Sequence, residues 1–267
     1  MNKLLNPIVV IGLGELGSVF ARGFLKSGLP VVPVTRQMTL SEVAQTVPEP
    51  TAVMVSVGEN DLHPVLEQLQ QMPASWQEHI ILIQNELLPK DWQTHGFKQP
   101  TVISVWFEKK KGMDSKVVLP SPIWGPHARL VFDALATLDL PSYLVDEAEE
   151  MTYELVRKNL YILTTNIAGL ALPPGSSVQQ LKENHNELMQ AVAAEVLKVQ
   201  SALTDIEWEK QSLIEGMLEA FAGDPAHKCM GRSAPTRLAR ALKIAKAHQI
   251  SVPTLTKIAQ EAGCPLP

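Results

Sequence analysis

The fold is decided by the stretch Pro7-Ile8-Val9-Val10-Ile11-Gly12-Leu13-Gly14-Glu15-Leu16-Gly17. Its β-branched start is typical of a strand buried on both faces of a parallel sheet. The glycines that follow fit the pattern G-x-G-x-x-G, and residues 18–27 then place apolar side chains at helical spacing. A strand, a glycine-rich turn and a helix in this order predict the start of a Rossmann-type domain.

Each glycine has a separate role in such a turn. Gly12 permits the tight exit from the strand, Gly14 lets backbone N–H groups approach a diphosphate, and Gly17 lets the helix pack closely on the sheet. The helix N-terminus adds unpaired N–H groups and the positive end of its dipole. We therefore predict that the turn from Gly12 to Gly17 binds a dinucleotide; the alternative is a purely structural turn. Glu15 is unusual beside a diphosphate, and we expect its side chain to face solvent.

The residues after the second strand indicate which dinucleotide is bound. An NAD enzyme would place a carboxylate there to hold the ribose hydroxyls. This sequence has Thr35-Arg36-Gln37 instead. A guanidinium pairs bidentately with a phosphate, so Arg36 favours NADP(H). The alternative for Arg36 is a solvated loop residue.

The first half of the chain alternates between strand and helix patterns. Helices are expected over residues 60–71 and 127–138. The sequence contains no internal repeats. The expected strands after Pro7–Ile11 are Val31–Val34, Thr51–Val57, His79–Gln84, Thr101–Phe107, Lys116–Leu119 and Ser142–Val145. This alternation predicts a doubly wound α/β sheet with right-handed crossovers.

After Asp146 the pattern becomes entirely helical. The helices expected there are Glu147–Leu172, Val178–Leu203, Ile206–Phe221, Ala234–His248 and Pro253–Ala262. We therefore predict a nucleotide-binding domain over residues 1–146 and an all-helical substrate and catalytic domain over residues 147–267.

Composition excludes several classes of function. A net charge of -5 is not the basic footprint of a nucleic-acid-binding protein. No window approaches the roughly 20 apolar residues of a membrane helix, and no secretory signal is recognisable, so we expect a cytoplasmic protein. The two cysteines are expected to be ordinary thiols, the scattered histidines predict no metal site, and Lys109-Lys110-Lys111 is interpreted as a solvated turn.

Two polar residues are candidates for catalysis. Asn85 follows an apolar strand at the carboxyl edge of the predicted sheet, where open α/β folds bind ligands. Its alternative is an asparagine that closes a turn. Lys158 lies in the long helix beside Arg157, about 100° away around the helix axis, and its alternative is a surface lysine.

In motif order the whole chain resembles the ketopantoate reductase (2-dehydropantoate 2-reductase) family. Besides the glycine turn and Arg36, the segments that carry the resemblance are Ile83-Gln84-Asn85, Trp124-Gly125-Pro126, Arg157-Lys158, Asn166-Ile167-Ala168-Gly169-Leu170, Gly231-Arg232 and His248-Gln249-Ile250-Ser251-Val252-Pro253. The lysine helix and the closing segment are more discriminating than the glycine turn, which many families share.

The resemblance implies hydride transfer from NADPH to the keto carbon of a 2-oxo acid in an interdomain cleft. Lys158 would be the general acid that donates a proton to the carbonyl oxygen. Asn85 would hold the nicotinamide ribose and orient Lys158. Asn166 would meet the polar end of the substrate; its alternative is a helix-capping or interhelical asparagine. We expect the partners to be a small-molecule substrate and a second copy of the chain in a homodimer. We expect no nucleic acid and no membrane as a partner.

The sequence also departs from the family pattern. A family glutamate before the last long helix is absent from Gly231–Arg237, a second asparagine falls on Ile162, and a lysine after the third strand is replaced around Gly58-Glu59-Asn60. Losing polar partners should change the substrate. Two alternatives therefore stay open: a catalytically lapsed protein that binds or senses NADP(H), and a related hydroxyacid or imine dehydrogenase.

Overall fold

The computed structural model describes residues 5–265, and the chain divides into two compact units. The first unit is Met1–Leu155 and the second is Val156–Pro267. The division falls inside the long helix α7, Ala148–Leu170, whereas the sequence pattern changes at Asp146, just before this helix begins.

The first unit is built on a sheet of seven strands in the order β2-β1-β3-β4-β5-β8-β9. All neighbouring pairs are parallel except β5 and β8. The strands of this sheet are β1 (Ile8–Ile11), β2 (Val31–Val34), β3 (Ala52–Val55), β4 (Ile80–Leu82), β5 (Thr101–Ile103), β8 (Ser121–Trp124) and β9 (Ser142–Leu144). A separate antiparallel hairpin pairs β6 (Phe107–Glu108) with β7 (Lys116–Val117). This is the doubly wound, mostly parallel sheet that the sequence predicts.

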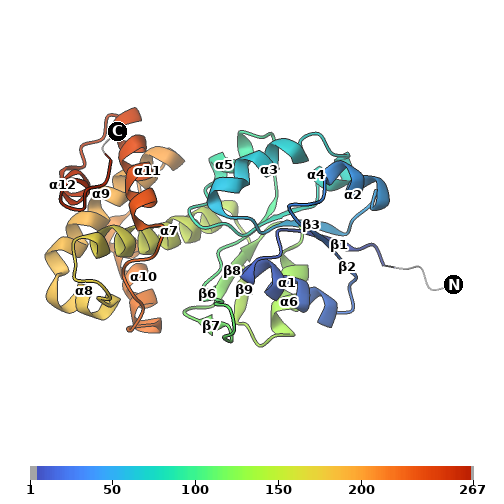
Figure 1. Ribbon diagram of the computed structural model, residues 1–267, viewed down its shortest axis with the longest axis horizontal. Coiled ribbons are helices and arrows are strands. Elements are labelled where there is room, and N and C mark those ends of the chain that lie inside the picture. Colours follow the sequence, from blue (N-terminus) through green and yellow to red (C-terminus); the bar gives the residue numbers. More distant parts are fainter. Residues whose placement is uncertain (1–4, 266–267) are drawn as a thin grey trace. The chain divides into compact units, whose positions relative to one another are not determined.

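Helices cover both faces of the sheet (Figure 1). On one face lie α1 (Glu15–Lys26) and α6 (Ala128–Ala136). On the other lie α2 (Leu40–Thr46), α3 (Leu62–Leu69), α4 (Ala74–Gln77) and α5 (Pro89–Gln93), with the short 3₁₀ helix η1 (Glu59–Asp61) leading into α3. Covering both faces explains why β1 and β3 are apolar throughout and fully buried.

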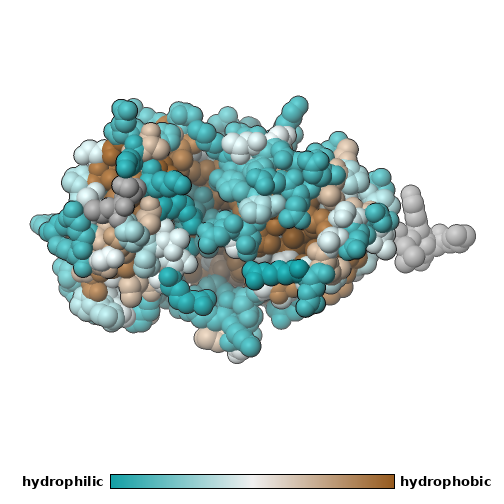
Figure 2. All heavy atoms as spheres, turned by 45° about the horizontal axis from the view of Figure 1, so that its top comes forward, coloured by the Kyte–Doolittle hydropathy of each residue, from teal (hydrophilic) through white to brown (hydrophobic). Residues whose placement is uncertain are grey.

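A glycine permits a close contact between α1 and α6 in the first unit. Phe20 and Phe24 of α1 are fully buried in the core beneath the sheet. A Cβ added at Gly23, between them, would lie 2.7 Å from the carbonyl oxygen of Ala134 in α6. The molecular surface seen in Figure 2 carries mainly hydrophilic side chains, with apolar patches between them.

The described residues of the second unit form helices joined by loops, with one isolated bridge between Ser177 and Lys228. Its helices after α7 are α8 (Val178–Asn184), α9 (Asn186–Thr204), α10 (Lys210–Gly223), α11 (Ala234–Ala247) and α12 (Pro253–Glu261). Gly169 near the end of α7 lets the segment Cys229–Met230 approach, since a Cβ there would lie 2.9 Å from the Met230 nitrogen. Among the described residues, no helix has the combined length and hydropathy that crossing a membrane requires.

Two expected strands are wrong in detail. Thr101–Phe107 is not continuous: β5 ends at Ile103 and β6 begins at Phe107 in the separate hairpin. Between them the chain turns away, with the Trp106 N–H donating to Ser121 Oγ at 2.9 Å. Lys116–Leu119 contributes only β7 to that hairpin, and the sheet continues instead through β8, which the sequence analysis missed because Pro122 argues against a strand.

The helix predictions also need correction. The expected helix Val178–Leu203 is two helices, because the chain leaves helical geometry at His185. The expected helix Ile206–Phe221 begins only at Lys210, where the Glu209 carboxylate accepts hydrogen bonds from the first N–H groups of α10. The sequence analysis also missed α2, whose N-cap Thr39 accepts a bond from the Glu42 N–H.

We expect the substitution Gly23→Ala to lower the free energy of unfolding. The added methyl group meets the Ala134 backbone, and such overpacking costs about 1–3 kcal/mol. This exceeds the roughly 1 kcal/mol that alanine gains over glycine inside a helix. Urea unfolding measures the change, with Arg22→Ala on the exposed face of α1 as control. A Gly23→Ala protein at least as stable as the control would contradict the close approach of α1 and α6.

A histidine pair should make the first unit less stable in acid. The Nε2 of His127 lies 2.9 Å from Nδ1 of His79, and burial, followed by the nearby His79, lowers the pKa of His127. The unfolded chain therefore binds more protons than the folded one around the ordinary histidine pKa of about 6.5. Stability is present above that value and is lost as the pH falls toward the lowered folded pKa.

Chemical unfolding between pH 8 and pH 5 tests this dependence. His127→Gln should flatten the curve on the acidic side, because the glutamine has no charge to gain. The exposed His248 provides the matched control, and His248→Gln should leave the curve unchanged. If the free energy of unfolding depends on pH equally in His127→Gln and in the unsubstituted protein, the acid sensitivity does not come from His127.

Candidate functional site

Three of the predicted nucleotide-binding features meet at one edge of the sheet. Strands β2, β1, β3 and β4 run parallel, so their carboxyl ends lie together. Gly12 follows β1, Arg36 follows β2 and Asn85 follows β4. The chain passes from β1 to one side for β2 and then to the other side for β3. The glycine turn thus occupies the topological switch point, where open α/β sheets bind ligands.

The geometry of the turn matches the role expected of each glycine. Gly12 has a φ of 90°, in the region that only glycine adopts readily. A Cβ at Gly17 would collide with the Gly12 carbonyl oxygen and the Ser56 hydroxyl, whereas a Cβ at Gly14 would meet nothing within 4 Å. Ser56, just after β3, donates to the carbonyl oxygens of Ile11 and Gly12. The turn is therefore packed tightly on one side and open in front of Gly14.

Helix α1 begins at this turn without a side-chain cap. Its N-cap is Gly14, which has no side chain to hydrogen-bond to the N–H groups of the first turn. Uncapped N–H groups at a helix N-terminus attract anions. Glu15 is exposed, as expected, with 45% of its side chain accessible, and its Oε2 also lies 3.6 Å from Nζ of Lys109.

Arg36 lies on the surface with its guanidinium paired to Asp61. The Arg36 side chain is 95% exposed, and its Nη2 lies 3.3 Å from Oδ2 of Asp61 in η1. An exposed pair of this kind contributes little to stability. The guanidinium is therefore held near the carboxyl edge while remaining accessible to an anion.

Asn85 occupies a turn after β4 and is half-buried. Among residues 5–265, none hydrogen-bonds its side-chain amide. The preceding Gln84 is buried and fixes the strand end, since its Nε2 donates to the Val55 carbonyl at 2.7 Å and its Oε1 accepts from the Ile83 N–H at 3.1 Å. Glu86 then adopts a φ of 59°. Asn85 is thus presented on a well-anchored turn.

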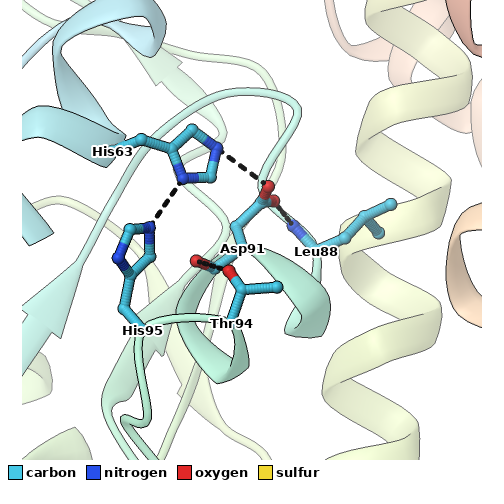
Figure 3. A network of polar contacts seen from close by, with 5 residues as sticks. All are labelled: His63, Leu88, Asp91, Thr94 and His95. Carbon is cyan, nitrogen blue, oxygen red and sulfur yellow. Dashed lines mark hydrogen bonds and ion pairs between the residues drawn. The ribbon is translucent and has the colours of Figure 1, made fainter. Parts of the chain in front are cut away.

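A polar network joins His63 of α3 to Asp91 of α5 and to His95, just after α5 (Figure 3). His63 Nδ1 lies 2.9 Å from His95 Nε2, and His63 Nε2 lies 3.5 Å from Asp91 Oδ1. The other oxygen of Asp91 accepts from the Leu88 N–H at the start of α5. Burial and His63 lower the pKa of His95, although Glu67 and Asp91 oppose this. The network ties α3 to the loop after α5.

In the second unit, Lys158 is not the surface lysine that its residue type suggests. Its exposed fraction is 7%, and it lies in a helix that is buried along most of its length. The adjacent Arg157 points elsewhere: it packs on Gly216 of α10 and pairs through Nη2 with Glu219 at 2.6 Å. Asn159 is also occupied, since its Nδ2 donates to Gln200 Oε1 at 3.1 Å. Lys158 and Arg157 therefore face different surroundings.

Asn166 is buried with an exposed fraction of 7% and contacts another helix. Its Oδ1 accepts a hydrogen bond of 3.1 Å from Nη1 of Arg237 in α11. This is the interhelical contact considered for Asn166 in the sequence analysis. Arg237 was missed as a site residue, because its pairing with a residue 71 positions earlier has no local signal.

A surface cavity of about 680 Å³ lies in the first unit away from the glycine turn. Its lining includes Trp124, Gly125 and Leu144, which follow or belong to β8 and β9. Because β8 runs antiparallel to β5, its carboxyl end lies at the opposite edge of the sheet from Gly12. The cavity is therefore separate from the candidate nucleotide site.

Both cysteines are free thiols, and burial raises the pKa of Cys229 to about 11.

No family model and no curated protein matches this chain. Solved structures, however, match it over nearly its whole length. A dimeric ketopantoate reductase from Staphylococcus aureus is 17% identical, with a TM-score of 0.65 and coverage of 96% of this chain and 97% of that chain. A 2-dehydropantoate 2-reductase from Methylococcus capsulatus is 12% identical, with a TM-score of 0.68 and coverage of 96% of each chain.

A third similar structure is a complex of D-mandelate dehydrogenase with NADH. It is 14% identical, with a TM-score of 0.64 and coverage of 97% of this chain and 100% of that chain. The matches extend through both the sheet and the helical unit, in agreement with the resemblance carried by the sequence motifs. The chain therefore has the fold of the ketopantoate reductases.

Proposed function

We propose that this protein is an NADPH-dependent reductase of a 2-oxo acid or a related carbonyl compound. The observation that carries the proposal is the glycine turn at the switch point, which is open in front of Gly14 and begins an uncapped helix. Similar folds occur in ketopantoate reductases and in a D-mandelate dehydrogenase complexed with NADH. These neighbours support an oxidoreductase that uses a nicotinamide nucleotide.

The residues at the carboxyl edge fit such a nucleotide. The turn offers backbone N–H groups to the diphosphate without a side chain at Gly14 to obstruct them. Arg36 would pair with a 2′-phosphate, since its guanidinium is exposed. It stands where an NAD enzyme would have the carboxylate that holds both ribose hydroxyls. Asn85, with an amide that no described residue engages, would hold the nicotinamide ribose.

The nucleotide would supply a hydride, and the chain would supply the proton. We assign Lys158 as the general acid that donates to the carbonyl oxygen as negative charge develops there. Burial of its side chain suits this role, because a charge excluded from water interacts more strongly with a developing oxyanion. Asn166, held by Arg237, would contact the polar end of the substrate.

The proposal includes a homodimer, because one ketopantoate reductase of this fold is described as dimeric. Its substrate is specified only as a 2-oxo acid or a related carbonyl compound, since the family glutamate is absent from Gly231–Arg237. A site that has exchanged its polar partners selects a different substrate.

Cofactor choice should depend on Arg36. We expect Arg36→Ala to weaken NADPH binding on the order of 10-fold to 100-fold, because it removes a charge-assisted contact to the 2′-phosphate. NADH binding should stay unchanged. Isothermal titration with both nucleotides measures the effect.

Asp61→Asn is the companion variant, since Asp61 pairs with the same guanidinium. Releasing Arg36 from this carboxylate should tighten NADPH binding and leave NADH binding unaltered. Tighter binding of NADH than of NADPH by the unsubstituted protein would overturn the assignment of Arg36.

Turnover should depend on Lys158. Lys158→Ala should lower kcat by a factor on the order of 100 to 10,000, the usual contribution of a general acid, and should leave NADPH affinity within about twofold. Loss of NADPH absorbance against a panel of 2-oxo acids measures the rate, and titration measures the affinity.

Lys182→Ala serves as the matched control, because Lys182 is an exposed lysine in the last turn of α8. Its rate should equal that of the unsubstituted protein. NADPH binding without turnover of any 2-oxo acid would reject the reductase and favour a protein that binds the nucleotide without catalysis.

A further inference from the structure

The β6–β7 hairpin is attached to the helix that begins at the glycine turn. Phe107 of β6 contacts Phe20 of α1, with ring centroids 6.1 Å apart. Phe107 is buried in the same hydrophobic cluster as Val19 and Phe20, and Val117 of β7 packs against that cluster. Apolar contacts therefore attach the hairpin to α1, within a cluster that also contains residues of the main sheet.

Lys109 is the first residue after β6, and its ammonium is held in a defined place. Its Nζ donates to the carbonyl oxygens of Lys110, at 2.8 Å, and Met113 within the hairpin loop. The same nitrogen lies 3.6 Å from Oε2 of Glu15, in the first turn of α1. Only 21% of the Lys109 side chain is exposed. The solvated turn expected for Lys109-Lys110-Lys111 is therefore wrong for its first lysine.

Glu15 alone would oppose the binding of a diphosphate. It directly follows Gly14, where the turn is open, and its carboxylate adds negative charge beside the N–H groups that would meet an anion. Lys109 offsets this charge. The next two lysines do not pair with Glu15: Lys110 pairs with Glu108 at 3.1 Å, and Lys111 is exposed.

We propose that Lys109 is a diphosphate-binding residue, delivered to the glycine turn by the β6–β7 hairpin and kept there by Glu15. The inference rests on the proposed binding of a nicotinamide nucleotide. A diphosphate carries more negative charge than one carboxylate, so it draws the ammonium from Glu15 toward the phosphate oxygens. An ammonium suits this exchange because it is a compact charge with three donors that reorient freely.

Two nucleotide fragments separate Lys109 from Arg36. ADP-ribose contains the diphosphate and lacks a 2′-phosphate, whereas adenosine 2′-monophosphate contains the 2′-phosphate and lacks the diphosphate. Lys109→Ala should raise the Kd for ADP-ribose on the order of 10-fold and leave that for adenosine 2′-monophosphate unchanged. Arg36→Ala should show the opposite pattern. NADPH contains both groups, so both variants should weaken its binding.

Glu15 provides a second, independent arm of the experiment. Glu15→Gln should lower the Kd for ADP-ribose a few-fold, because it removes the carboxylate that competes for Lys109. In the Lys109→Ala protein the same change should restore part of the lost affinity, because an unpaired carboxylate no longer faces the diphosphate. Lys109→Arg should retain most of the affinity, and Lys110→Ala and Lys111→Ala should behave like the unsubstituted protein.

The outcomes distinguish this inference from the function on which it rests. If the unsubstituted protein binds neither NADPH nor NADH, the proposed function fails first. If it binds NADPH but Lys109→Ala binds ADP-ribose normally, only the role of Lys109 is rejected. If Lys109→Ala weakens both fragments equally and lowers the Tm of the free protein, Lys109 merely anchors the hairpin, and the proposal is again rejected.

Discussion

The close packing of the glycine turn against the end of β3 is the constraint on which the candidate site depends. Ser56 donates to the carbonyl oxygens of Ile11 and Gly12. The missing side chain of Gly17 makes room for the Ser56 hydroxyl and the Gly12 carbonyl oxygen. These contacts turn the backbone sharply out of β1 and direct the first turn of α1 toward the open side. A bulkier residue at Gly17 would displace the turn, and with it every N–H group that could meet a phosphate.

Charges around this turn are arranged in pairs that an anion could exchange. Arg36 is held by Asp61 and Lys109 by Glu15, and in each pair the acidic partner remains partly exposed. Exposed pairs contribute little to folding, so their value for stability does not explain the arrangement. A carboxylate that orients a cation and then yields it to a phosphate does explain it. This interpretation also accounts for an acidic residue beside a turn that is otherwise suited to anions.

Local patterns predicted the features that depend on local physics, and tertiary pairing decided the rest. The glycine turn, the position of Asn85 after β4 and the long helix α7 follow from spacing and residue type. The strand β8 does not, because Pro122 lowers its β propensity, and only its pairing with β5 and β9 makes it a strand. Contacts such as Lys109 with Glu15 join distant residues of unremarkable type, so no sequence window could reveal them.

The composition of α7 is the strongest physical reason to look for chemistry in the second unit. A buried helix is most stable when its side chains are apolar, since each buried polar group must recover its lost hydration through hydrogen bonds. Several residues of α7 nevertheless combine polarity with burial: Glu154, Lys158, Asn159, Thr164, Thr165 and Asn166. Packing against α9 accounts for Asn159 through Gln200, but an ammonium is a costly substitute for leucine in such a position. The proposed role of Lys158 as proton donor would give this buried ammonium a function.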